Sequence, residues 1–143
     1  MSVEQISVFL DNKAGRLSEV TDVLAKAGIN MSALSIADTT HFGILRLIVN
    51  RPDEAEKVLK ESGFTVSKTE VLAIAIDDTA GSLAGALRML TDSGISIEYI
   101  YAFVTRKADC AMVVLKIEDE ARAVELFKAN GVRVLTESEV SEL

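Results

Sequence analysis

The chain has 143 residues, of which 49% are hydrophobic, a composition that excludes a disordered protein and allows one ordinary domain or two small ones. Its net charge is −7 and no run of Lys or Arg exceeds two residues, which excludes nucleic acid and anionic membrane surfaces as partners. The single cysteine, Cys110, rules out an internal disulfide and fits a cytoplasmic location.

Apolar alternation in the first half predicts strands at 6–10, 31–37 and 44–49, and a fourth that begins at 64–66. The strand at 44–49 is apolar on nearly both faces, so we expect it to be central in its sheet. The first ten residues carry no basic region, so we expect a strand there and not a signal peptide. No apolar run is long enough to span a membrane.

Apolar spacings of three and four predict two helices between these strands. The first covers Leu17 to Ala27 and is closed by a left-handed cap at Gly28. The second starts at Pro52, a favourable first helical position, and ends at Gly63. The first half therefore has the order strand, helix, strand, strand, helix, strand.

The second half repeats this pattern. The glycine pairs that align are Gly15 with Gly81, Gly28 with Gly94 and Gly63 with Gly131. The offset is 66 residues for the first two pairs and 68 for the last, so the second copy holds two extra residues between its middle strand and its last helix. We predict two homologous domains, 1–69 and 70–143, with Asp119 capping the last helix. The fold class is α+β, with two ferredoxin-like βαββαβ domains, each an antiparallel sheet with both helices on one face.

The two halves differ on the sheet face that the helices leave uncovered. Alternating positions carry Tyr99, Tyr101 and Phe103 in the second half and Ala33, Ser35 and Ala37 in the first. One interpretation is that the rings pack across a domain or subunit interface. The other is that a tyrosine hydroxyl reaches a bound ligand.

Side chains that could perform catalysis are few. His41 is the only histidine and falls in a predicted polar turn, and Cys110 falls in a predicted central strand, where a thiol behaves as a small hydrophobe. No phosphate-binding loop, dinucleotide motif or paired metal ligand is found. We therefore expect no enzyme activity, no cofactor and no metal site.

The turn that precedes the first helix is the strongest candidate for a binding site. Asn12 lies before this helix and Asn30 after it, and we expect the two strands they border to come close at the same end of the sheet. Both side chains would then face one small space above the helix start. Backbone N–H groups of Gly15, Arg16 and Leu17 would bind a carboxylate, and the Asn oxygens would accept from an ammonium group. An α-amino acid carries both groups.

The motif around this turn resembles that of the ACT domain family. The stretch 12–17, Asn-Lys-Ala-Gly-Arg-Leu, is similar to the family's Asn or Asp, any residue, Pro, Gly, any residue, Leu, with Ala14 in place of Pro. The stretch 28–31, Gly-Ile-Asn-Met, is similar to the Gly-Ile/Val-Asn-Ile that follows. The resemblance covers the whole chain as a tandem pair. It implies a regulatory module that binds an amino acid, and in serine-sensing members the asparagines equivalent to Asn12 and Asn30 hold the ligand.

The resemblance thus implies a small cytoplasmic regulatory protein that binds a free amino acid at an inter-domain or inter-subunit interface, forms a homodimer and has no catalysis of its own. The ligand-binding residues would be Asn12, Lys13, Ala14, Gly15, Arg16, Leu17, Asn30 and Met31. Their second-repeat equivalents are Asp78, Gly81, Ser82, Leu83 and Ser96, with Tyr99 and Tyr101 as wall contacts. The alternative is an interaction module without a ligand, or a regulatory subunit that docks a metabolic enzyme through its exposed sheet.

Overall fold

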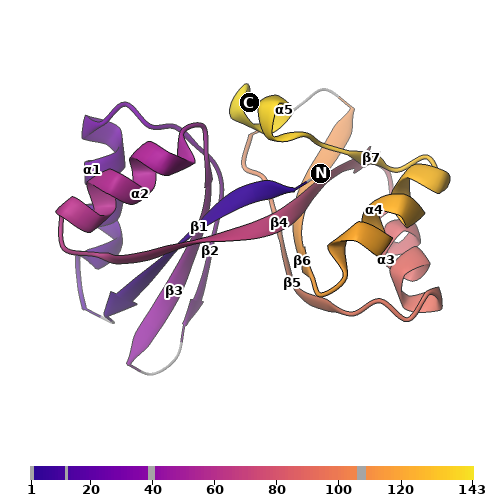
Figure 1. Cartoon of the computed structure of the whole chain (residues 1–143), viewed down its shortest axis with the longest axis horizontal. Helices are drawn as coiled ribbons and strands as arrows, with labels where there is room; N and C mark the ends of the chain where they lie inside the picture. The colour runs from indigo at the N-terminus through magenta and orange to yellow at the C-terminus, as the bar shows by residue number, and fades with distance from the viewer. Residues whose placement is uncertain (1, 12, 39–40, 106–108) are drawn as a thin grey trace. The chain divides into compact units, whose positions relative to one another are not determined.

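The computed structural model describes residues 2–11, 13–38, 41–105 and 109–143 (Figure 1). The chain forms two compact units, which are described one at a time. The N-terminal unit comprises residues 4–69 with 141–143, and the C-terminal unit comprises residues 70–140 with 2–3.

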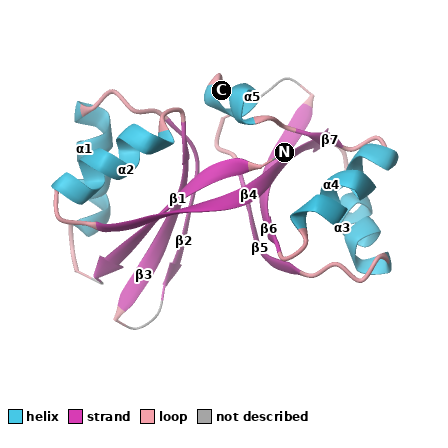
Figure 2. Ribbon diagram, viewed as in Figure 1, coloured by secondary structure: helices cyan, strands magenta, loops and turns pink. Residues whose placement is uncertain are grey.

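The N-terminal unit holds a four-stranded sheet with two helices on one face (Figure 2). Its elements are β1 (Val3–Asp11), α1 (Arg16–Lys26), β2 (Met31–Asp38), β3 (Phe42–Val49), α2 (Pro52–Glu61) and the first part of β4 (Thr65–Asp77). The strand order is β2-β3-β1-β4, so the strand predicted to be central, β3, lies between β2 and β1. β3 is antiparallel to both neighbours.

The C-terminal unit repeats this architecture. It contains the rest of β4, then α3 (Ser82–Asp92), β5 (Ile97–Ala102), β6 (Cys110–Ile117), α4 (Glu120–Ala129), β7 (Arg133–Val134) and α5 (Glu137–Ser141). Here β6 lies between β4 and β5, and β7 pairs with β4. α3 and α4 contact one another, as α1 and α2 do. The predicted α+β fold class, with two ferredoxin-like repeats, is confirmed.

Each core forms where the helix stripe meets the alternating strand face. The buried helix positions of the first unit are Val20, Leu24, Ala55 and Leu59, and those of the second are Ala86, Leu90, Ala123 and Phe127. Corresponding members stand 66 residues apart in α1 and α3, and 68 apart in α2 and α4. Removing one such side chain from water contributes roughly 1.5–3 kcal/mol.

The predicted helix caps are confirmed. Gly28 has a φ of 69°, and its N–H donates to Ala25 O while the next N–H, of Ile29, donates to Leu24 O. This is the hydrogen-bond pattern of a Schellman motif. At α4 the Asp119 side chain accepts a hydrogen bond from the Arg122 N–H at 3.2 Å.

Three features go beyond the sequence prediction. β4 is a single strand of 13 residues, so the fourth strand of the first repeat and the first strand of the second are continuous. β7 has only two residues, and α5 follows it. β6 already stands 68 residues after β3, whereas β5 stands 66 after β2. The two extra residues therefore lie between the starts of β5 and β6.

Candidate functional site

The turn between β1 and α1 is shaped by a glycine. Gly15 is the N-cap of α1 and has a φ of 86°, in the left-handed region that L side chains disfavour. A Cβ built there would meet no atom within 4 Å, so the backbone conformation and not the space selects glycine. Gly81, the N-cap of α3, has a φ of 89°. Neither N-cap has a side chain to accept from the first helical turn, whose N–H groups are therefore left for other acceptors.

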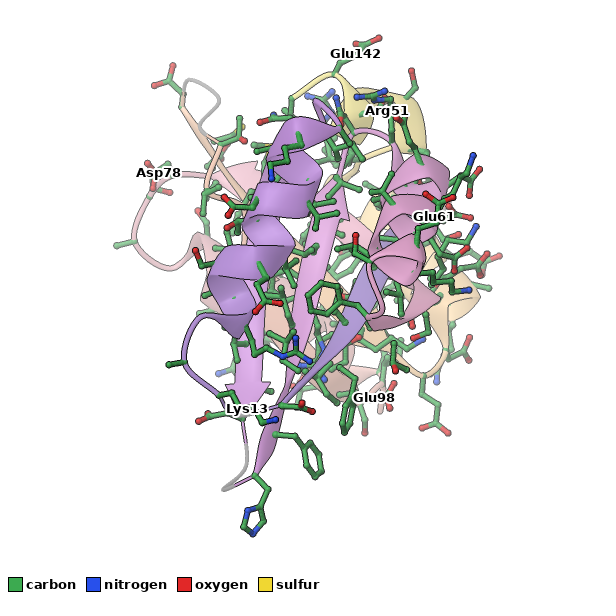
Figure 3. All side chains as sticks on the ribbon, turned by 90° about the vertical axis from the view of Figure 1, so that its left-hand side faces the viewer. Lys13, Arg51, Glu61, Asp78, Glu98 and Glu142 are labelled. Atoms are coloured by element: carbon green, nitrogen blue, oxygen red, sulfur yellow. The ribbon has the colours of Figure 1, made fainter. Side chains whose placement is uncertain are left out.

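The residues predicted around the first turn are mostly exposed. Asn12 lies outside the described residues. Lys13 and Ala14 are exposed, and Figure 3 places Lys13 at the turn that follows β1. The N–H of Arg16 faces Lys13 O at 3.4 Å, a long hydrogen bond. Leu17 is 38% exposed.

The side chain of Arg16 is held on three sides. Its guanidinium lies 3.4 Å from the Asp11 carboxylate and 3.0 Å from that of Glu19. It also stands over the ring of Phe64 at 5.3 Å from the centroid, a cation–π arrangement. Arg16 thus fills the space between the end of β1 and the start of β4.

Asn30 lies at the start of β2, and its backbone is fixed by Asn50. The Asn30 N–H donates to Asn50 Oδ1 at 3.0 Å, and the Asn50 N–H donates to Asn30 O at 3.1 Å. Met31 is half-buried against the core. Sequence reasoning missed Asn50, whose only signal is a polar residue directly after a buried strand. It also missed Arg51, whose Nη2 donates to Ala27 O and Gly28 O at the end of α1.

The expectation that Asn12 and Asn30 share one space within a unit is wrong. In the strand register Asp11, which directly precedes Asn12, is level with Phe42, whereas Met31, which follows Asn30, is level with Val49. These partners are seven residues apart along β3, or about 23 Å at ~3.3 Å per residue. The reason is topological: β1 and β2 are both antiparallel to β3 and hence parallel to each other, so α1 returns the chain to the opposite end of the sheet. Lys13 and Arg51 accordingly lie at opposite ends of α1 in Figure 3.

The second-repeat residues show the same separation. Asp77, before Asp78, pairs with Cys110, whereas Ile97, after Ser96, pairs with Ile117 at the other end of β6. Asp78 and Ser96 are exposed, and the Asp78 N–H donates to Asp109 O at 3.2 Å. Ser82 is half-buried, with its hydroxyl 2.7 Å from that of Thr79, and Leu83 is 37% exposed.

Tyr99 and Tyr101 are half-buried on β5, with their rings stacked at 6.4 Å between centroids. They share one face of the strand, while Ile100 between them is 38% exposed. Both proposed roles, packing and ligand contact, remain predictions.

Among the described residues, no group of three or more His, Cys, Asp or Glu side chains is placed to hold a metal ion. In the same part of the chain, every helix is too short or too polar to cross a membrane.

The whole chain, residues 1–143, matches the family model described as "ACT domain pair". The crystal structure of protein BT0572 from Bacteroides thetaiotaomicron is similar at 43% identity and a TM-score of 0.93, over 100% of this chain and 98% of that one. The regulatory subunits of aspartate kinase from Thermus thermophilus, in ligand-free form, and Thermus flavus share the fold at 15% and 17% identity. Their TM-scores are 0.66 and 0.61, over 88% of this chain and 90% of each subunit. No curated protein matches the sequence.

Proposed function

The chain belongs to the ACT domain family as a tandem pair, and we propose on this basis that it is a cytoplasmic regulatory protein that binds a free amino acid. It would have no catalysis of its own, and residues 1–69 and 70–143 would each be one ACT domain. The observation that carries the proposal is the family match over the full length of the chain. ACT domains are regulatory, amino-acid-binding modules.

We propose that the amino acid lies between two copies of the chain in a homodimer. Since the turn at Asn12–Leu17 and the strand start at Asn30–Met31 are about 23 Å apart in one unit, a single unit cannot close both around one small ligand. The turn of one copy would bind the carboxylate through the N–H groups of Gly15, Arg16 and Leu17. Asn30 of the other copy would accept from the ammonium group.

Binding at such a site would couple the ligand to assembly. A ligand held by two copies stabilises the packing that presents both halves of its site, and a partner enzyme that contacts one packing would sense this difference. The regulatory subunits of aspartate kinase, which share the fold, motivate a metabolic enzyme as that partner.

Thermal unfolding in the presence of each free amino acid tests the proposal. A ligand at 100 times its dissociation constant adds about 2.7 kcal/mol of stability. Asn12→Ala and Asn30→Ala should each abolish the shift. In a mixed dimer of the two single variants, one site keeps both asparagines, so half of the binding capacity should return. A flat screen refutes amino-acid binding, and a mixed dimer that binds nothing refutes the site between copies.

A docking module without a ligand is the second candidate function. It is favoured by Phe9 and Phe42, which are 45% and 39% exposed and stack at 4.7 Å between ring centroids on the sheet of the N-terminal unit. Adjacent exposed rings on one sheet are typical of contact surfaces. If Phe9→Ser with Phe42→Ser frees a co-purifying enzyme while the amino-acid screen stays flat, this candidate replaces the first.

A further inference from the structure

The C-terminal unit contains a hollow of about 340 Å³ at the end of β4, a size within the range of small-molecule sites. It is enclosed by the starts of α3 and β6 and by the segment that leads into β7. Among its lining residues are Ala75, Asp77, Ser82, Cys110, Val132 and Arg133. All of them belong to this one unit.

The same place in the N-terminal unit is filled by large side chains. The residues 66 or 68 positions earlier replace each small lining residue with a larger one: Phe9 for Ala75, Phe42 for Cys110, Arg16 for Ser82 and Phe64 for Val132. These four form two contacts, the stacked ring pair at 4.7 Å and the guanidinium over a ring at 5.3 Å. The hollow is thus the volume that two packed pairs occupy in the first repeat.

The charge at this place also differs between the repeats. Asp11 is compensated by the Arg16 guanidinium at 3.4 Å. Its equivalent, Asp77, keeps the carboxylate, but Ser82 stands where the arginine would be. Asp77 is exposed and has no ion pair among the described residues. Arg133 at the rim is already compensated by an ion pair with Glu139.

We propose that this hollow binds a small organic cation with an apolar body, an amine or guanidine. The cationic group would meet the Asp77 carboxylate, as the Arg16 guanidinium meets Asp11 in the first repeat. The apolar body would lie against Ala75 and Val132, in the volume that Phe9 and Phe64 take up there. The site lies within one unit and does not depend on the amino-acid site proposed between copies.

Phenethylamine and its neutral isostere 2-phenylethanol are the probes, and Cys110 supplies the readout. Cys110 is the only cysteine of the chain, is half-buried and lines the hollow. A bound probe should slow its alkylation by iodoacetamide, and the probe concentration that halves the rate gives the affinity. We expect phenethylamine to bind at least about tenfold more tightly than 2-phenylethanol, since a charge-assisted hydrogen bond is worth ~1.5–3 kcal/mol.

Three variants separate the site from unspecific binding. Asp77→Asn should weaken phenethylamine binding about tenfold, for the same reason. Asp11→Asn, the matched change in the first repeat, should leave binding unchanged. Ser82→Arg with Val132→Phe copies the first repeat into the second and should abolish protection while the chain keeps its circular dichroism spectrum.

The proposal is overturned if neither probe protects Cys110, if both protect it equally, or if the refilled double variant still binds. Binding lost equally in Asp77→Asn and Asp11→Asn also overturns it. Asn30→Ala should leave phenethylamine binding intact, so a failure here is distinct from a failure of the amino-acid site.

Discussion

Two glycines at the start of α3 should respond to the same substitution with opposite signs. Gly81 is the N-cap, with a φ of 89°, whereas Gly85 lies one turn further on in the helix and has no positive φ. Both are exposed, and a Cβ at either would meet no atom within 4 Å. The two positions therefore differ in backbone conformation and not in the space around them.

The expected magnitudes follow from this conformational difference. Gly81→Ala places a Cβ in the left-handed region and should lower the free energy of unfolding by roughly 1–2 kcal/mol. Gly85→Ala removes the entropic cost of a helical glycine and should raise it by about 0.5–1 kcal/mol. The two variants should thus differ by about 2 kcal/mol.

Urea denaturation followed by circular dichroism measures both values, with the slope of the transition as a check that the unfolded state is unchanged. If Gly81→Ala is neutral or stabilising, the left-handed N-cap does not select glycine at this turn. If Gly85→Ala destabilises the protein, Gly85 has a packing role that the open space around it does not indicate.

Four further substitutions test the packing, the caps and the pH dependence. Leu24→Ala removes a fully buried core side chain and should cost about 2–5 kcal/mol in the free energy of unfolding, whereas Leu17→Ala, at a position 38% exposed, should cost far less; equal losses would contradict the assigned core. Arg51→Gln removes the cap on the last carbonyls of α1 and should cost about 1 kcal/mol by urea denaturation, an effect that an unchanged midpoint would refute. Backbone and guanidinium hydrogen bonds lower the pKa of Glu139 in the folded chain, so its stabilising effect is present above the unfolded value of about 4.3 and is lost as the pH falls through the folded pKa. Glu139→Gln keeps the capping geometry and should flatten this dependence in melting curves below about pH 4.3; an unchanged curve would show that another group is responsible.

Local patterns in the sequence were sufficient to predict the elements. The alternation at Ile6, Val8 and Leu10 and the helical spacing of Leu24 and its neighbours identify β1 and α1, because each buried stripe has the period of its own backbone. α5 was missed although Thr136 and Glu139 have the spacing of a capping box and accept each other's backbone N–H groups. The predicted boundary between residues 69 and 70 falls inside β4 and stays a prediction.

The candidate site could be predicted only in part. Gly15 and Gly81 were recognisable because a strand-to-helix turn needs a left-handed residue, and both have a positive φ. The joint site for Asn12 and Asn30 was wrong because proximity in a sheet depends on strand direction, which neither motif encodes. The roles of the predicted residues stay predictions.

The sequence by itself determined that the chain is a tandem repeat of one α+β unit, because core periodicity, glycine caps and the family motif are all properties of short segments. Only the tertiary structure decided which residues meet. It separated the two ends of α1, and it brought Asp77, Ser82 and Val132 together around a hollow that Arg16 and Phe64 fill in the other repeat. Contacts of this kind join segments tens of residues apart, so they depend on strand order and register and not on local pattern.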